Sequence, residues 1–131
     1  SELKNSIMLN DAKAPHFAYV GDSILGNNVN LGAGTKLSNL SVASEKELST
    51  GKRPTIKIVI DAEEVDTDLA KLGAIIGDDA QTGCNAVTNP GTLIGKNSLV
   101  YANTSVSKGL IPENSIVKLR QVTEIDTRRT D

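Results

Sequence analysis

Hydrophobic residues recur every six positions over most of the chain, in two runs that begin at residues 19 and 76. The first position of each hexad is usually Leu, Ile or Val, and the fifth is usually a small residue such as Ser, Thr or Ala. A period of six is neither the 3.6 of a helix nor the alternation of a strand. It predicts short strands joined by tight turns, with three such edges, about 18 residues, closing one triangular coil.

Coils of this kind stack at about 4.8 Å, the spacing of paired strands. We therefore expect the first-position side chain to point into the prism, with the small fifth-position side chain beside it. The expected first positions are Tyr19, Leu25, Leu31, Leu37, Ile76, Thr82, Thr88, Ile94, Val100 and Val106. The expected fifth positions are Ser23, Val29, Thr35, Ser41, Ala80, Ala86, Thr92, Ser98, Thr104 and Leu110. Glycine recurs at the second position, where we expect either a clash for any side chain or a positive φ.

The phase of the repeat breaks between the two runs, which predicts that residues 43–72 leave the coil as an insertion. Residues 55–60, TIKIVI, alternate as a strand does, and the DAEEVDTD that follows could turn this strand back as a hairpin. Such insertions often build the binding face of a solenoid, although a hairpin that only covers apolar surface is an equal alternative. We expect a solenoid domain over residues 1–112 and a charged tail over 113–131, either ordered against it or solvated.

Composition excludes several classes of function. The chain has one His, one Cys and no Trp among its 131 residues, which excludes a disulfide framework and leaves no basis for a metal site. Lys and Arg number 14 against 16 Asp and Glu, and this balanced charge argues against a nucleic-acid partner. No apolar run approaches the ~20 residues that span a bilayer, and the N-terminus is not a signal peptide. We therefore expect a cytoplasmic protein without membrane association.

The six-residue pattern resembles that of the hexapeptide-repeat family, which implies an all-β, left-handed parallel β-helix with an inserted loop or hairpin. The segment KAPHFAYVGDSILGNNVNLGAGTKLSNL (13–40) resembles the C-terminal domain of bifunctional sugar-1-phosphate nucleotidyltransferases, whose solenoid is an amino-sugar-1-phosphate N-acetyltransferase. LGAIIGDDAQTGCNAVTNPGTLIGKNSLVYANTSV (72–106) is similar to the next coils of that domain, especially in glucose-1-phosphate thymidylyltransferase-like members. The resemblance implies that an N-terminal nucleotidyltransferase domain, with its Mg²⁺, lies outside this sequence.

The same resemblance implies roles for the matching residues. His16 matches the catalytic base of the family. The residues implied to hold the sugar phosphate are Lys4, Tyr19 and Asn30, with Lys57 and Lys71 as candidates for a second phosphate-binding lysine. The residues implied to contact acetyl-CoA, the co-substrate, are Asn39, Cys84 and Ala102. The family further implies a homotrimer with the site in the cleft between neighbouring prisms.

The chemistry of the residues agrees with these roles. Transfer of an acetyl group from a thioester to an amine needs a base, and an imidazole, with its ordinary pKa near 6.5, suits that task near pH 7. No catalytic triad is needed, because CoA already carries an activated acyl group. We predict an acetyl-CoA-dependent N-acetyltransferase acting on glucosamine-1-phosphate or galactosamine-1-phosphate in nucleotide-sugar biosynthesis.

Simpler interpretations remain for each residue. His16 could be a surface or capping residue. Asn30 and Asn39 could be turn or ladder asparagines, and Cys84 could be a small packing residue with no chemical role. At the level of the whole chain, the alternative is a non-catalytic trimerising or regulatory solenoid of a sugar nucleotidyltransferase. That alternative is favoured by the long insertion and by Leu40, which stands where some members of the family have Tyr.

Overall fold

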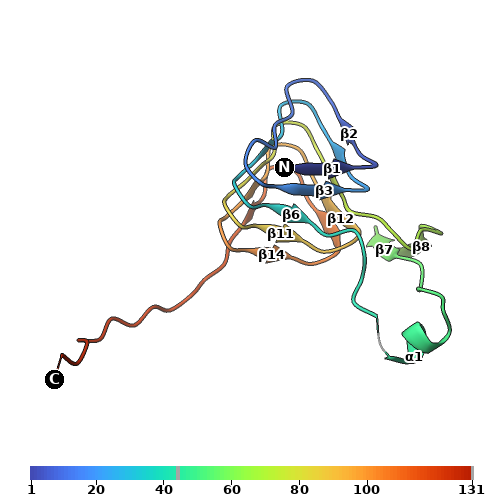
Figure 1. Cartoon of the computed structure of the whole chain (residues 1–131). Coiled ribbons are helices and arrows are strands. Elements are labelled where there is room, and N and C mark those ends of the chain that lie inside the picture. The colour runs from blue at the N-terminus through green and yellow to red at the C-terminus, as the bar shows by residue number, and fades with distance from the viewer. Residues whose placement is uncertain (44, 131) are drawn as a thin grey trace.

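The computed structural model describes residues 1–43 and 45–130 and shows the triangular solenoid of parallel strands predicted from the hexads, consistent with the left-handed β-helix that the family resemblance implied (Figure 1). Its three flat sides are called faces A, B and C. Face A consists of β1 (Glu2–Lys4), β3 (Tyr19–Gly21), β6 (Lys36–Leu37), β11 (Val87–Thr88) and β14 (Ser105–Val106). Face B consists of β2 (Ile7–Met8), β4 (Ile24–Leu25), β9 (Ala74–Ile76), β12 (Thr92–Ile94) and β15 (Gly109–Ile111). Face C consists of β5 (Asn30–Leu31), β10 (Gln81–Thr82), β13 (Leu99–Val100) and β16 (Ile116–Val117).

One inward side chain from each short strand fills the interior of the prism. The expected first positions from Leu25 to Val106 are all buried, and so are the expected fifth positions except Ser41 and Leu110. Inward residues of successive coils stack in register, as Leu25 does on Ile76. The interior is therefore a column of aliphatic and small side chains, too narrow for large rings.

Tyr19 does not point inward, and the prediction for this position was wrong. Val20 is the buried residue of β3 and stacks on Leu37, whereas Tyr19 is half-buried and pairs with Lys36 on the outside of face A. The coil that contains Tyr19 is one residue shorter than three full hexads, since Val20 pairs with Leu37, seventeen positions on. This shortening moves the apolar tyrosine from the inside of the prism to its surface.

The corners of the prism explain the recurrent glycines. A Cβ on Gly83 would lie 2.5 Å from the backbone nitrogen of Ala102 in the next coil, and one on Gly26 would lie 2.8 Å from the backbone nitrogen of Asp78. The second-position glycines are therefore required by close approach of backbones and not by a positive φ. The left-handed residue is instead the fourth of the hexad, which is Asn or Asp at most corners, as at Asn85 (φ 57°), because these residues tolerate that conformation best after glycine.

The insertion leaves the solenoid after β6 and returns before β9. It contains a short helix, α1 (Glu45–Ser49), and the expected antiparallel hairpin of β7 (Lys57–Ile60) and β8 (Glu63–Asp66). Ile56 and Ile58 are buried, and both lie within 3.2 Å of the place a Cβ on Gly91 would occupy. The hairpin therefore covers apolar surface at the corner between faces A and B.

The solenoid continues past residue 112, since β16 pairs with β13. Residues 118–130 have no regular secondary structure and extend away from the prism as an exposed segment (Figure 1). Lys118, at the start of this tail, lies with its Nζ 5.7 Å from the centre of the Tyr101 ring. Residues 118–130, the greater part of the expected tail, are thus exposed, whereas Ile116 and Val117 belong to the solenoid.

Replacing Gly83 by Ala tests the corner argument. The added methyl group would force the Gly83 and Ala102 backbones apart, and overpacking of this kind costs about 1–3 kcal/mol of unfolding free energy. Urea unfolding followed by circular dichroism measures the loss. Gln81→Ala, at an exposed position of the same coil, is the control and should change stability by less than about 0.5 kcal/mol. Equal stability of the two variants would contradict the argument.

Candidate functional site

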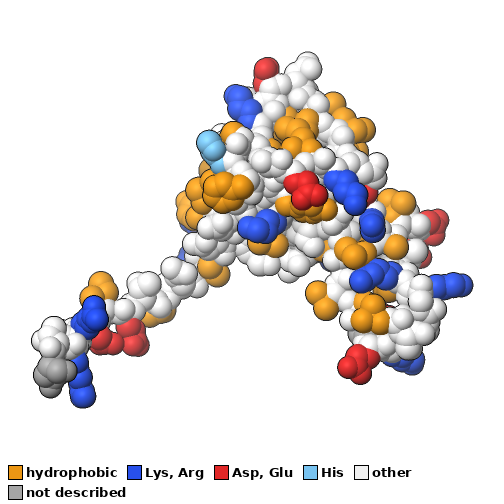
Figure 2. Space-filling view, viewed as in Figure 1, with side chains coloured by type: hydrophobic (Ala, Val, Ile, Leu, Met, Phe, Trp, Pro, Cys, Tyr) orange, Lys and Arg blue, Asp and Glu red, His pale blue; other side chains and the backbone are white. Residues whose placement is uncertain are grey.

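His16 lies at the corner where the first complete coil passes from face C to face A. Its carbonyl oxygen accepts a hydrogen bond from the Gly34 amide (3.0 Å), and the Phe17 ring lies over Gly34, 3.2 Å from where a Cβ would stand there. The backbone of the corner is therefore held by the coil beneath it, while the His16 side chain is exposed (Figure 2). A fixed backbone with a free imidazole can present a base to a bound molecule.

Small residues continue the same corner through the next three coils. The strand register places Ala33, Cys84 and Ala102 in one column that begins at His16, since Leu31 pairs with Thr82 and Thr82 with Val100. The backbones are in direct contact along this column, as the Gly83–Ala102 approach shows. The structure thus brings His16, Cys84 and Ala102 onto one edge of the prism, and the residues of this column below His16 are all small.

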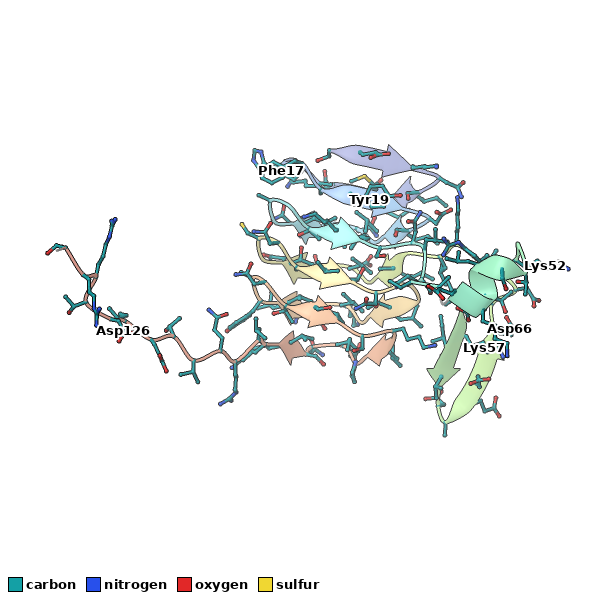
Figure 3. The ribbon with its side chains drawn as sticks, turned by 60° about the horizontal axis from the view of Figure 1, so that its bottom comes forward. Phe17, Tyr19, Lys52, Lys57, Asp66 and Asp126 are labelled. Carbon is teal, nitrogen blue, oxygen red and sulfur yellow. The ribbon has the colours of Figure 1, made fainter. Side chains whose placement is uncertain are left out.

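Tyr19 lies on face A, between the His16 corner and the opposite corner, where the insertion emerges (Figure 3). Its hydroxyl is 2.6 Å from the place a Cβ on Gly21 would take, and Nδ2 of Asn39 is equally close to the same place. Gly21 is therefore required for the Tyr19 hydroxyl and the Asn39 amide to approach one another over face A. Asn39 belongs to this group and not to the column of Cys84 and Ala102.

Asp22 is the charged centre of the corner between faces A and B. Asn5 Nδ2 donates to its Oδ1 (2.5 Å), and Asn39 Nδ2 donates to its Oδ2 (2.6 Å). The hydrogen bond from Asn5, followed by that from Asn39, holds the pKa of Asp22 below its ordinary value against the opposing effect of burial, and the charges of Lys71 and Lys4 also lower it. Asp22 thus stays a carboxylate with both oxygens engaged and two ammonium groups near it.

The two lysine candidates for the second phosphate contact have different surroundings. Lys71 lies beside Asp22 where the insertion rejoins the coil, in an antiparallel bridge with Leu40. Lys57 lies on the hairpin opposite Asp66, whose pKa is lowered by the Asp68 amide, then by Thr55, and also by the Lys57 charge (Figure 3). The structure therefore groups Lys71 with Lys4 and Tyr19, and leaves Lys57 outside the group.

A groove beside Asp22 keeps this corner open to solvent. Its volume is about 280 Å³, and Asn5, Asp22 and Lys71 form its polar rim above apolar side chains of face B. A ligand can therefore reach the Lys71 ammonium group without displacing packed side chains.

Asn30 is exposed on face C, where β5 pairs with β10. Its side chain points outward on a different face from Tyr19, with the His16 corner between them. A single prism therefore does not bring Asn30 and Tyr19 to one surface.

Sequence reasoning missed three residues that the structure adds to this region. Asp22 is part of the quoted GD pair, and Ala33 is part of the quoted GAGT, but neither was singled out. Lys36 pairs with Tyr19 across face A, with its Nζ donating to the Gly34 carbonyl (2.8 Å). Lys36 lies seventeen residues after Tyr19, which is the length of one short coil. The sequence could identify it as a neighbour of Tyr19 only if that coil length were already known.

Residues 1–43 and 45–130 contain neither a membrane-spanning helix nor a group of metal-binding side chains. No helix there is long and apolar enough to cross a bilayer. In the same described segments, no three His, Cys, Asp or Glu side chains are grouped so that they could hold a metal ion.

Comparison with known proteins gives one consistent result. No family model matches the chain. It is 39% identical over 129 residues to "Bifunctional protein GlmU" of Methanococcus maripaludis strain C7, an alignment that covers 98% of this chain and 29% of the relative. It is 36% identical over 107 residues to "Bifunctional sugar-1-phosphate nucleotidylyltransferase/acetyltransferase" of Sulfurisphaera tokodaii, covering 82% of this chain and 24% of the relative. It is 32% identical over 118 residues to "Bifunctional protein GlmU" of Methanocaldococcus jannaschii, covering 90% and 26%.

The chain thus spans less than a third of the length of each of these relatives. The matched part is their C-terminal part, and its fold here is the β-helix described above. The chain is therefore a homologue of the C-terminal part of the bifunctional, GlmU-type sugar-1-phosphate nucleotidyltransferase/acetyltransferases.

Proposed function

We propose that this chain transfers an acetyl group from acetyl-CoA to the amine of glucosamine-1-phosphate or galactosamine-1-phosphate, as part of a protein that makes nucleotide sugars. One observation carries the proposal: the single His of the chain is exposed at a rigid corner of the prism, next to a face with Tyr19, Lys4 and Lys71. The word acetyltransferase in the name of the Sulfurisphaera relative supports the same reaction.

His16 acts as the general base in this reaction. The amine nitrogen attacks the thioester carbonyl carbon, and the imidazole accepts the proton that the nitrogen loses as the new C–N bond forms. The C–S bond then breaks, and the proton on the imidazole can pass to the departing CoA thiolate. The products are the N-acetylated sugar phosphate and free CoA, so the step needs no further reactant.

The edge below His16 fits an extended acyl carrier. Ala33, Cys84 and Ala102 present only small side chains, so this column leaves room for a pantetheine arm to lie along the prism. Held in that way, the thioester would stay beside the His16 imidazole, and such positioning of two reactants supplies a large part of the rate of many transfers.

The opposite side of face A suits the sugar phosphate. Lys4 and Lys71 supply two positive charges against the single charge of Asp22, and the Tyr19 hydroxyl is a further donor for phosphate oxygens. This net positive charge favours a small anionic ligand.

We propose that the chain works as a homotrimer with each site between neighbouring prisms. Asn30 and Tyr19 point from different faces, so both could contact one sugar if they came from adjacent copies. Face B also carries an aliphatic stripe that runs across five strands in register and is largely exposed. The stripe consists of Ile7, Ile24, Ile75, Leu93 and Leu110. An exposed apolar stripe of this kind is typical of a surface that packs against another chain.

Replacing His16 by Ala tests the proposed reaction. Turnover should fall by roughly 10²–10⁴-fold, the usual contribution of a general base, with an unchanged unfolding midpoint because the side chain is exposed. The measurement is release of free CoA thiol from acetyl-CoA, with each hexosamine-1-phosphate as acceptor. Lys13→Ala, an exposed change in the same coil, is the control. An unaltered rate in the His16 variant would refute the role of His16 and favour the non-catalytic solenoid.

The two lysines provide a matched pair of variants. Lys71→Ala should raise KM for the sugar phosphate about tenfold, because it removes one charge-assisted contact to phosphate, and should leave KM for acetyl-CoA unchanged. Lys57→Ala should leave both constants unchanged, because this side chain faces Asp66 on the hairpin. Steady-state kinetics with each substrate varied in turn measures both effects. The reverse ranking of the two variants would assign the phosphate contact to Lys57.

The trimer is tested at the centre of the aliphatic stripe. Ile75→Glu places a charge between Ile24 and Leu93 and should convert the trimer into monomers, seen as a threefold lower mass by light scattering. Val59→Glu changes an exposed aliphatic residue of the hairpin and should retain the trimer. A wild-type monomer, or a trimer that persists in the Ile75 variant, would contradict the assignment.

A further inference from the structure

The residues Asn5, Asp22 and Asn39 occupy the same corner of three successive coils. Asp22 is anchored on both sides through its backbone: its amide donates to the Lys4 carbonyl (3.0 Å), and its carbonyl accepts from the Gly73 amide (2.8 Å). Its φ of 47° is in the left-handed region, which Asp and Asn adopt more readily than other side chains. The carboxylate therefore has a fixed place between the two asparagines.

The contact between Asp22 and Asn39 selects one orientation of an amide. A carboxylate only accepts hydrogen bonds, whereas the side-chain amide of Asn has a donor end and an acceptor end. Asn39 must therefore turn its Nδ2 to Asp22 Oδ2, as observed at 2.6 Å, and its Oδ1 away from that carboxylate. The Asn39 backbone is fixed as well, since its carbonyl accepts from the Leu72 amide (3.0 Å).

The orientation matters because Asn39 lies beside the proposed reaction site. Its Nδ2 and the Tyr19 hydroxyl are both 2.6 Å from the place of a Cβ on Gly21. If the Asn39 amide were flipped, Nδ2, a donor, would take the place of Oδ1, an acceptor, on the side that faces a bound substrate. Only the observed orientation leaves Asn39 Oδ1 as an acceptor for an N–H group.

We propose that Asp22 is a positioning residue that holds Asn39 Oδ1 toward an N–H donor of the bound substrates during acetyl transfer. The inference rests on the proposed function, and it adds a residue and a role to it. The N–H donor is either the amine of the sugar phosphate or an amide of the pantetheine arm, and the kinetic constants of the two substrates distinguish these sources. Asp22 touches neither substrate and acts through Asn39.

The test is Asp22→Asn, which keeps the size of the side chain and its tolerance of a positive φ. An asparagine at position 22 can offer its own NH₂ to Asn39, so the flipped orientation becomes populated. We expect kcat to fall about tenfold, the equivalent of one hydrogen bond of about 1.4 kcal/mol. KM for the sugar phosphate should be unchanged or lower, because a negative charge between Lys4 and Lys71 is lost. A higher KM for acetyl-CoA would assign the N–H to the pantetheine arm, and an unchanged one assigns it to the amine.

Asn28→Gly is the matched control. It removes a hydrogen bond of the same kind, from Asn28 Nδ2 to Asp79 Oδ1 (2.9 Å), at the corner between faces B and C. Glycine tolerates the φ of 59° at that position, and Asn39 stays held. We expect this variant to lower the unfolding midpoint as much as Asp22→Asn does while retaining kcat. An equal loss of kcat in both variants would show that Asp22 is only structural and would overturn the inference.

A double-mutant cycle separates this inference from the proposed function. If Asp22 acts through Asn39, then Asp22→Asn should cost nothing further in a chain that already carries Asn39→Ala. Additive losses of kcat would overturn the positioning role while the loss of turnover in His16→Ala still stood. No turnover in the wild-type chain would overturn both.

The side-chain amide resonance of Asn39 gives a second readout that does not depend on activity. It should shift when Asp22 is protonated at acid pH and should not shift over the same pH range in Asp22→Asn.

Discussion

The close stacking of backbone on backbone at the corners is the constraint on which this structure depends. Each coil can lie at strand spacing from the next only if no Cβ intrudes, and the Gly83–Ala102 approach shows how little room there is. The same stacking makes every outward residue a neighbour of residues about one coil away in sequence. Columns of side chains therefore form along the edges and faces of the prism, and both halves of the candidate site are such columns.

The hexads predicted the interior well because burial of the first and fifth side chains of each hexad leaves a strong signal. They failed at Tyr19 because a coil that lacks one residue shifts the phase, and Tyr19 and Val20 are both apolar enough to continue the pattern. The hairpin was predictable from the alternation of apolar and polar residues in TIKIVI. Its contact with Gly91 was not, because Gly91 belongs to the second run of hexads and lies far from the hairpin in the sequence.

The candidate site was predicted as separate residues and not as an arrangement. His16, Cys84 and Ala102 came from resemblance, and only the register of face C shows that they share one edge. Asp22 was missed because its partners depend on coil length. A coil of eighteen residues would place Asp22 beside Lys4 and Leu40, whereas the observed pairing of Lys4 with Gly21 places it beside Asn5 and Asn39. A coil of seventeen residues and one of eighteen thus place different side chains beside the Asp22 carboxylate.

The bridge between Leu40 and Lys71 joins the two ends of the insertion at its base. Because the chain leaves and rejoins the coil at adjacent points, the insertion is a closed loop whose length does not affect the stacking of coils above and below it. Such a loop can be lengthened, shortened or exchanged during evolution without refolding the prism. Since Lys71 is the last residue of that loop and lies beside Asp22, each such exchange would also reset the charge at the site, which gives related solenoids a simple route to different anionic ligands.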